Sequence, residues 1–388
     1  MAQHIVTGID IGTYHVKVVV ARVDSQNPQS HPHILGTGFA ESHGLRHGYI
    51  VNEADITRSI QNAITQAEKS SGLHIKHAYL SMGGIGIDEI HTRGETITSR
   101  ADSTITQADI DKAIEVCESN IQEKIPNRKI LHAIPLSYTV DHERVHGRPH
   151  NLKGTKLEVD VLFVTAFEQH LNDLVSAVEN LGVRVIDIMA APMAASLVLL
   201  NKTQKRAGCV LANIGSETLS IAVYEHDIPV SIKVFSLGSN DITNDIALGL
   251  KISIEDAEKL KRGGIITTPY SKKRLDEIVA ARLSDMFELI EAHLRKIKRD
   301  GLLPAGIILS GGGASLTTIQ DQARASLQLP AKIATLDVTQ NNKVRDSVWA
   351  IAYGLCVWGM TGTDEESGIK AARVAKSKIL NWLKQFLP

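Results

Sequence analysis

The sequence is poor in cysteine and has almost no net charge, and each shortage excludes a class of protein. Its 388 residues include three cysteines, Cys117, Cys209 and Cys356, which are scattered and odd in number. This usage argues against a disulfide-stapled secreted domain and fits a reducing compartment. Lys plus Arg number 42 and Asp plus Glu number 43, a net charge of −1. The chain therefore lacks the overall basic character of a nucleic-acid-binding protein.

Long hydrophobic runs are also missing. No stretch of about 18 or more apolar residues occurs, so we expect no membrane-spanning helix. Residues 1–6 already enter a strand pattern, which indicates that no secretory signal precedes the fold. The hydrophobic content of 43% and the charged content of 22% are those of an ordinary folded protein. The length predicts about two to three domains with a sizeable core.

The two halves of the chain open with the same pattern of three strands joined by short turns. In the first half the first turn reads Asp10-Ile-Gly-Thr13, and in the second half it reads Asn213-Ile-Gly-Ser216. The strand candidates are residues 4–13, 16–23 and 33–39, and residues 208–216, 219–224 and 229–235. Long helical patterns follow at 53–70 and 276–300. Matching strand order and matching turn chemistry predict a duplicated α/β architecture.

Each first turn combines glycine with a hydroxyl residue, which lets the backbone approach phosphate oxygens closely. One such turn alone is most often an ordinary β-turn, but two that face each other would clamp a triphosphate from both sides. Asp10 is placed to hold Mg²⁺ through water, and Lys17 is placed to reach phosphate oxygens. The pair of turns therefore favours a nucleotide site between two lobes.

Two further segments extend this predicted site. Residues 307–315 form a strand that runs into three glycines ahead of a helix predicted over 316–327, a loop that resembles the adenosine side of nucleotide sites. The same loop is also common as plain packing in α/β folds. On a helical segment at 256–262, Glu258, Lys261 and Arg262 are placed to hold ribose and stack on adenine. The alternative for this helix is an exposed charged face.

These motifs resemble the actin-like ATPase superfamily, which includes actin, Hsp70 and sugar kinases. Within it the chain resembles the FtsA family of bacterial cell division proteins, and this second resemblance covers nearly the whole sequence. The segments that carry the FtsA resemblance are 131–138, 181–185, 245–250 and 277–282.

The resemblance implies a duplicated actin-like (ribonuclease H-like) α/β fold, with two lobes around a nucleotide cleft and an inserted small α+β subdomain. The implied parts are a first lobe core at 1–82 with 161–195 and about 357–368, the inserted subdomain at 83–160, a second lobe core at 196–232 with 301–356, its outer subdomain at 233–300, a linker at 361–376 and a terminal amphipathic helix at 377–388. In the inserted subdomain, a helix over 106–119 opens with the capping-box pattern Thr106-Gln-Ala-Asp109.

The resemblance also implies ligands, partners and site residues. FtsA-like proteins bind ATP with Mg²⁺, assemble into filaments and tether the tubulin-like protein FtsZ to the inner face of the plasma membrane at the division site. The inserted subdomain would contact later division proteins, and Arg282 would contact the C-terminal tail of FtsZ. The implied nucleotide-binding residues are Asp10, Gly12, Thr13, Tyr14, His15, Lys17, Asn213, Gly215, Ser216, Glu217, Thr218, Gly238, Glu258, Lys261, Arg262, Gly311, Gly312, Gly313 and Ser315.

The sequence departs from the family pattern at three positions. Asn213 replaces the usual aspartate of the second turn and cannot supply a second carboxylate on the Mg²⁺ side. Glu217 replaces a glycine, so it would either repel the nucleotide or take over a metal contact. Ala191 stands where chaperone and MreB-type members carry a glutamate, and it cannot orient or deprotonate a water. We therefore expect ATP binding with weak or absent hydrolysis.

The end of the chain predicts a membrane-binding helix. Six apolar residues share one face at a helical period, and from Lys370 onward five basic and no acidic residues occur. The six residues are Ile379, Leu380, Trp382, Leu383, Phe386 and Leu387. The alternative is a terminal helix docked on its own core, which the acidic, glycine-containing linker disfavours.

Two other functions remain open on the same fold. A PilM-like platform for pilus assembly would be expected to lack the cationic tail. A small-molecule kinase would need a catalytic carboxylate near the cleft, and Ala191 and the apolar tail speak against one.

Overall fold

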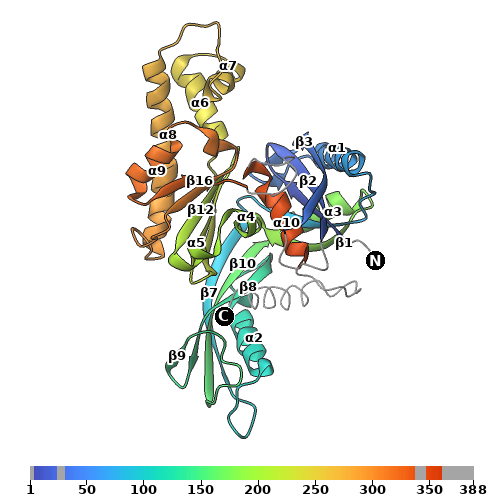
Figure 1. Ribbon diagram of the computed structural model, residues 1–388, viewed down its shortest axis with the longest axis vertical. Helices are drawn as coiled ribbons and strands as arrows, with labels where there is room; N and C mark the ends of the chain where they lie inside the picture. The colour runs from blue at the N-terminus through green and yellow to red at the C-terminus, as the bar shows by residue number, and fades with distance from the viewer. Residues whose placement is uncertain (1–3, 24–30, 337–346, 361–388) are drawn as a thin grey trace.

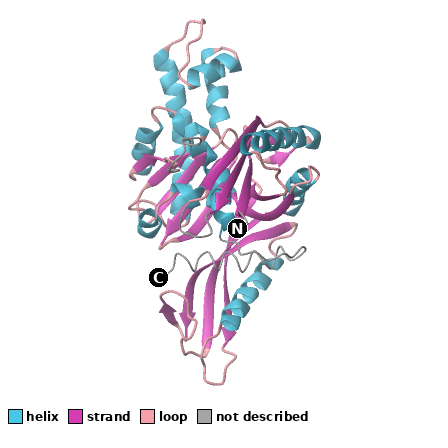
Figure 2. Cartoon of the chain, turned by 45° about the vertical axis from the view of Figure 1, so that its right-hand side comes forward, coloured by secondary structure: helices cyan, strands magenta, loops and turns pink. Residues whose placement is uncertain are grey.

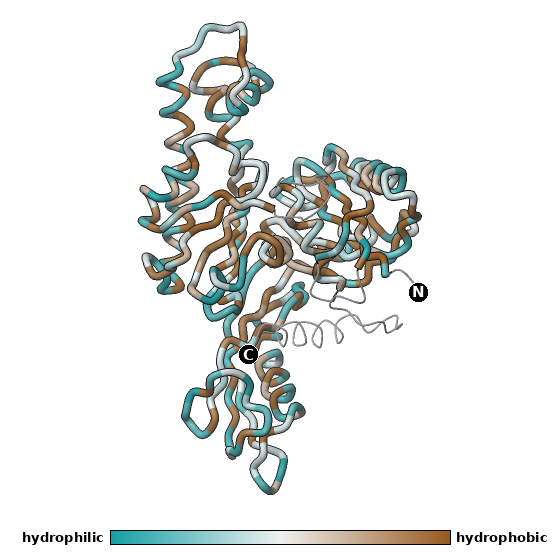
Figure 3. The backbone as a smooth tube through the Cα atoms, viewed as in Figure 1, coloured by the Kyte–Doolittle hydropathy of each residue, from teal (hydrophilic) through white to brown (hydrophobic). Residues whose placement is uncertain are grey.

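The computed structural model describes residues 4–23, 31–336 and 347–360, which form two lobes side by side and a smaller subdomain below them (Figure 1). The first lobe, blue in Figure 1, lies at the right, and the second, yellow to orange, at the left. Apolar residues follow the strands of both sheets and the helices between the lobes (Figure 3). The expected linker at 361–376 and amphipathic helix at 377–388 lie outside the described residues.

The first lobe is built on a five-stranded sheet in the order β11-β6-β1-β2-β3. Strands β1, β2 and β3 form the predicted antiparallel meander, while β6 and β11 add parallel strands. The strands are β1 (His4–Ile11), β2 (His15–Val23), β3 (His33–Glu41), β6 (His77–Met82) and β11 (Arg184–Ala190). A small hairpin, β4 (Leu45–Arg46) and β5 (Tyr49–Ile50), precedes the helices α1 (Glu53–Ser71) and α3 (Glu168–Glu179).

Helix α1 lies where the apolar spacing predicts it. It begins after Asn52, whose side chain accepts a hydrogen bond from the Asp55 N–H, and ends at Gly72 with φ 70°. Its buried face, which includes Ile56 and Ile60, packs on β3 and β2. The spacing of these residues at about one helical turn explains why the segment forms an amphipathic helix.

The second lobe repeats the arrangement, with the sheet order β14-β13-β12-β15-β16. The strands are β12 (Cys209–Ile214), β13 (Leu219–Glu225), β14 (Ile228–Phe235), β15 (Ile307–Ser310) and β16 (Ala331–Ile333). The helices are α5 (Lys202–Ala207), α6 (Ser239–Leu250), α7 (Ile254–Lys261), α8 (Lys272–Lys296) and α9 (Ile319–Leu327). In both sheets the meander's first strand is flanked by its second strand and by a later parallel strand, so the predicted duplication is confirmed. Helices α6, α7 and α8 form the outer part, at the top of Figure 1.

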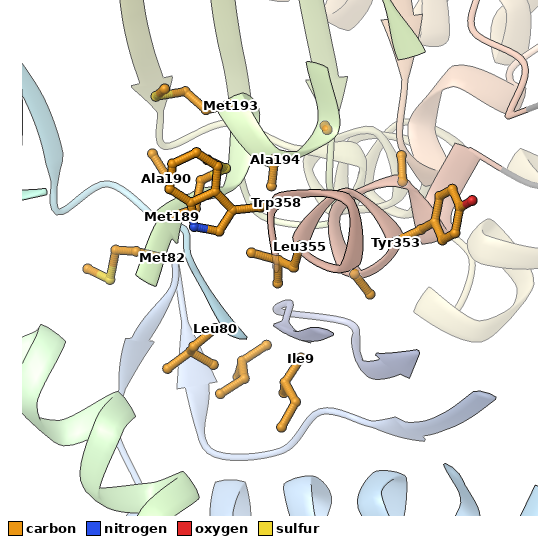
Figure 4. Close-up of a cluster of buried hydrophobic side chains, with 14 of the residues drawn as sticks. Ile9, Leu80, Met82, Met189, Ala190, Met193, Ala194, Tyr353, Leu355 and Trp358 are labelled. Carbon is orange, nitrogen blue, oxygen red and sulfur yellow. The ribbon is translucent and has the colours of Figure 1, made fainter. Parts of the chain in front are cut away.

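Two helices lie between the lobes, α4 (Ala191–Leu199) and α10 (Ala350–Met360). Their close approach requires glycine, because a Cβ on Gly354 would lie 2.0 Å from the Ala194 carbonyl oxygen. Side chains from both helices, among them Met193, Tyr353 and Leu355, join strand residues in one buried cluster (Figure 4). Helix α10 is apolar on nearly every side because the first sheet and α4 cover it.

The inserted subdomain is a four-stranded antiparallel sheet, order β7-β10-β8-β9, with helix α2 along it (Figure 2). Its elements are β7 (Ile87–Ile97), α2 (Gln107–Gln122), β8 (Arg128–Val140), β9 (Glu143–Val145) and β10 (Lys156–Phe167). Strand β10 continues this sheet beyond residue 160. The capping box at Thr106 and Asp109 is confirmed. Burial would raise the pKa of Asp109, but hydrogen bonds from Thr106 and Ser99 outweigh it and lower the pKa to about 2.

The other helix predictions need small corrections. The helix expected over 276–300 is α8, Lys272–Lys296, because the Ser271 side chain caps its first turn. The helix expected from residue 316 begins at Ile319, because one turn of 3-10 helix (Gly312–Ser315) comes first. Within the described ranges, no helix combines the length and the apolar character needed to cross a membrane.

Candidate nucleotide-binding cleft

The two glycine turns meet where the lobes face each other. The Thr13 and Ser216 hydroxyls share a hydrogen bond of 2.8 Å across 203 residues of sequence. Both turns are tight: a Cβ on Gly12 would lie 2.9 Å from the His15 carbonyl oxygen, and one on Gly215 would lie 3.0 Å from that of Thr218. A side chain would force a shift at Gly12 and crowd the Thr218 carbonyl at Gly215, so glycine suits both turns, and a ligand between the lobes would meet bare backbone on both sides.

Asp10 and Lys17 lie opposite each other in the β1–β2 register. Their side chains form an ion pair of 3.5 Å, and the Ser81 hydroxyl donates a hydrogen bond of 2.9 Å to the Asp10 carboxylate. Asp10 is 4% exposed, so its charge is held inside the first lobe by these two donors. In the part of the chain that the structure describes, no group of three or more His, Cys, Asp or Glu side chains is arranged to hold a metal ion. Asn213, in the second turn, brings an amide and no carboxylate.

The third glycine run lies directly against the second turn. Gly311 has φ 85°, and a Cβ there would lie 2.5 Å from the Ile214 carbonyl oxygen; a Cβ on Gly313 would lie 2.4 Å from the Ile214 side chain. On Gly312 a Cβ would meet no described atom within 4 Å. The buried Ser310 hydroxyl has no hydrogen-bond partner among the described residues. At Gly312 this loop therefore leaves open space beside its backbone, where a polar ligand could approach.

The predicted triad on α7 is partly buried and connected to α6. The Lys261 ammonium contacts the Glu258 carboxylate at 2.7 Å and donates to the Thr243 hydroxyl at 2.7 Å and the Ser239 carbonyl at 3.1 Å. Burial would raise the pKa of Glu258, but hydrogen bonds from Lys261, Thr243 and Arg262 outweigh it and lower the pKa. The alternative of a solvated charged face is wrong for Lys261, whose side chain is 8% exposed.

Arg262 reaches across to the first lobe. Its guanidinium forms an ion pair with Glu258 at 2.6 Å and donates a hydrogen bond of 2.8 Å to the Tyr14 hydroxyl. The neighbouring His15 ring lies edge-on to both Tyr14 and Phe39. Burial and the nearby Lys17 lower the pKa of His15 despite Glu41. Tyr14 and Arg262 thus form a second bridge between the lobes.

Gly238 and the first turn of α6 support the second glycine turn. The Ser239 and Asn240 N–H groups donate to the Gly215 and Ser216 carbonyls at 2.9 Å and 2.8 Å. A Cβ on Gly238 would lie 2.3 Å from the Ser216 carbonyl oxygen, so only glycine allows this approach. Residues 215–218 are therefore held rigidly by the helix behind them.

Glu217 makes a contact that the sequence does not reveal. Its carboxylate accepts a hydrogen bond of 2.6 Å from the His47 N–H, at the tip of the β4–β5 hairpin in the first lobe. The His47 imidazole also lies 3.2 Å from the Glu217 carbonyl oxygen. No spacing or motif connects two residues that are 170 positions apart, and only the charge at a glycine position marks Glu217 as unusual.

Two further predicted positions lie elsewhere in the fold. Ala191 is the buried first residue of α4 and brings no functional group to the cleft. Arg282, on α8, is occupied by Asp245 of α6 through two hydrogen bonds of 2.6 Å and 3.1 Å, and by Asp285 at 3.1 Å. It belongs to the outer part of the second lobe and not to the cleft.

Comparison of the sequence with known families gives two matches. Residues 210–354 match the family model for cell division protein FtsA, and residues 87–165 match that for the SHS2 domain inserted in FtsA. The chain is 26% identical over 379 residues to cell division protein FtsA of Pseudomonas aeruginosa, covering 92% of this chain and 89% of that protein. It is 28% identical over 371 residues to FtsA of Bacillus subtilis, covering 89% and 81%.

Solved structures show the same fold at lower identity. The PilM–PilN type IV pilus biogenesis complex superposes with a TM-score of 0.68 at 17% identity, covering 92% of this chain and 98% of that chain. MreB5 of Spiroplasma citri bound to ADP superposes with a TM-score of 0.52 at 13% identity, covering 92% and 97%. The duplicated sheets, the paired glycine turns and the inserted subdomain are thus those of an actin-like protein, and the chain belongs to the FtsA family of cell division proteins.

Proposed function

We propose that this chain is a nucleotide-binding, filament-forming scaffold that tethers the FtsZ ring to the cytoplasmic face of the cell membrane and helps to recruit later division proteins. The observation that carries the proposal is the meeting of Thr13 and Ser216 between two lobes of an FtsA-family chain. A ligand held by both turns would couple the relative position of the lobes to its own binding, and filament contacts depend on that position.

The residues of the cleft suit an adenine nucleotide. The turns at Gly12 and Gly215 would receive phosphates through backbone N–H groups, as other glycine-rich turns do. Lys17 would add a positive charge, and Asp10 would hold Mg²⁺ through water. The run from Gly311 to Gly313, with Ser315, would face the base and ribose beside Glu258, Lys261 and Arg262. MreB5, which shares the fold, is bound to ADP in one solved structure.

Hydrolysis is a minor part of this function. ATP supplies a triphosphate whose terminal group can leave, but the water that attacks it needs a group that orients it. Ala191 has no such group, and Asn213 has no charge to hold a metal ion. We propose that the nucleotide acts chiefly as a clasp between the lobes.

The membrane and FtsZ contacts lie outside the cleft. Full burial of a large apolar side chain contributes about 1.5–3 kcal/mol. The six apolar side chains in residues 377–388 would be only partly buried in lipid, and their gain must offset the entropy cost of ordering that segment. Binding of one tail is therefore marginal, and a filament strengthens it through many tails. For the acidic tail of FtsZ, Arg282 remains the proposed contact, and that tail would have to compete with Asp245 and Asp285.

Electron microscopy on lipid monolayers tests the whole proposal. The full chain, with ATP, should form filaments on lipid, and a variant that lacks residues 377–388 should form none there. The same samples should bind a fluorescent adenine nucleotide in solution whether or not the tail is present. Filaments on lipid without residues 377–388, or no nucleotide binding, would refute the corresponding part.

A PilM-like platform is the second candidate, because the PilM–PilN complex shares the fold closely. Liposome pelleting distinguishes the two functions, since only the tether requires residues 377–388 to bind lipid. A small-molecule kinase is tested by phosphotransfer to a panel of sugars and carboxylic acids, which we expect to give no product.

A further inference from the structure

Glu217 is the one carboxylate in the second phosphate turn, and it takes part in joining the lobes. Among the residues that the structure describes, three hydrogen-bonded pairs cross between the lobes here: Thr13 with Ser216, Tyr14 with Arg262, and His47 with Glu217. The first pair is neutral, and the second contains an exposed guanidinium that Glu258 already neutralises. Only the third places an unneutralised anion at the junction, and charge-assisted hydrogen bonds are about twice as strong as neutral ones.

The donor that meets Glu217 is held rigidly. The His47 carbonyl accepts a hydrogen bond of 3.2 Å from the Ile85 N–H, which ties the hairpin to the β6–β7 connection. Gly48 and Gly84 pack so closely that a Cβ on Gly48 would lie 2.4 Å from the Gly84 Cα. The His47 N–H is therefore aimed at the second turn by the backbone around it and not by a flexible side chain.

The charge of Glu217 has no cationic partner. Across residues 4–23, 31–336 and 347–360 no lysine, arginine or histidine forms an ion pair with it, and Lys17 is paired with Asp10. Glu217 directly follows Ser216, the residue that meets Thr13, so its negative charge belongs to the phosphate-binding turn itself. A further negative group brought into this turn would be repelled by it.

We propose that the Glu217 carboxylate is a built-in anion that joins the lobes through the His47 N–H, the role that a terminal nucleotide phosphate would otherwise fill. The lobes then stay joined without a nucleoside triphosphate, and the cleft prefers a nucleoside diphosphate. The preference rests on the proposed nucleotide binding, whereas the joining of the lobes stands on the contact alone.

Hydrogen–deuterium exchange of the full chain tests the contact. The His47 amide should be protected in the wild type without nucleotide, with Mg-ADP and with Mg-AMPPNP. In Glu217→Gly its exchange without nucleotide should rise at least about tenfold, because the acceptor is gone, and AMPPNP should restore protection. His47→Gly is the matched control: φ at this residue is 50°, glycine adopts it freely, and the amide donor remains. Equal protection in the wild type and Glu217→Gly would overturn the proposal.

Competition against a fluorescent nucleotide tests the preference. The wild type should bind ADP more tightly than AMPPNP, and Glu217→Gly should shift the ratio of affinities toward AMPPNP by about tenfold, which equals about 1.4 kcal/mol. Glu217→Gln, which keeps an acceptor but loses the charge, should shift the ratio nearly as far and keep the amide protected. An unchanged ratio would overturn the preference. Binding of neither nucleotide by any variant would refute the proposed function, and exchange at His47 would still decide the contact.

Discussion

The Arg262 guanidinium donates a hydrogen bond of 2.8 Å to the Tyr14 hydroxyl, 248 residues earlier in the chain, and lies 5.6 Å from the centre of the same ring. Tyr14 directly follows the first glycine turn, and Arg262 ends the helix that carries Glu258 and Lys261. This pair therefore connects the predicted phosphate and ribose sides of the cleft across the two lobes.

Replacing Arg262 by alanine should weaken nucleotide binding by several-fold while the protein stays folded. The side chain is 57% exposed, so its removal should cost about 1 kcal/mol or less in stability. Titration with a fluorescent nucleotide and thermal unfolding measure the two effects. Tyr14→Phe keeps the ring and removes only the hydroxyl, so its effect should be smaller; a larger effect would contradict this account of the pair.

Asp10→Asn should abolish or strongly reduce nucleotide binding, by at least about tenfold, and cost about 1.5–3 kcal/mol of stability. The carboxylate is buried and neutralises Lys17 while it accepts from Ser81, so the amide leaves a partly buried cation without its counter-charge. Urea unfolding and nucleotide titration give both quantities. Wild-type affinity in the Asp10→Asn variant would show that the first turn does not bind phosphate through this pair.

Gly354→Ala should destabilise the protein by about 2 kcal/mol or more. The new Cβ would lie 2.0 Å from the Ala194 carbonyl oxygen, so α10 and α4 would have to separate and open the core between the lobes. Gly312→Ala is the control, because a Cβ there meets no described atom within 4 Å. Urea unfolding should show a large loss only for Gly354→Ala, and similar losses in both variants would contradict the packing argument.

Acid should destabilise the fold through His132. This ring is 2% exposed, its Nε2 accepts a hydrogen bond from the Ala190 N–H, and burial lowers its pKa to about 3. The unfolded chain takes up a proton near the ordinary histidine pKa of about 6.5, so stability is full above that pH and falls as the pH drops toward 3. Between pH 7.5 and pH 5 this residue should account for about 2 kcal/mol.

Urea unfolding of His132→Asn at both pH values measures this effect. The variant should be less stable than the wild type at pH 7.5 but should lose about 2 kcal/mol less on acidification. Burial lowers the pKa values of His170 and His293 to about 4. Both residues remain in the two proteins, so their contribution to the pH dependence of stability is the same in each. Equal losses in wild type and variant would mean that His132 is not kept neutral by its burial.

Much of the cleft could be predicted because its chemistry is local. The tight turns at Gly12 and Gly215, where each glycine packs against a carbonyl oxygen three residues later, can be recognised from their own short sequence motifs. The capping box at Thr106 is equally predictable from the sequence, since both partners lie within one helical turn. The start of α9 is not, because the 3-10 turn before it depends on contacts between Gly313 and Ile214 in another strand.

The amino-acid sequence alone determined the two meanders, their glycine turns and the spacing of the large helices, since backbone conformation and apolar period act over a few residues. The sequence placed both turns and residues 258–262 at one cleft, but the direct contacts within it come from the fold: Thr13 with Ser216, Tyr14 with Arg262, and His47, which no motif marks, with Glu217. Partners separated by 203, 248 and 170 residues have no local signal, because their contact results from packing two lobes around α4 and α10. The sequence marks Glu217 as unusual in a glycine turn, and only the fold brings His47 to it.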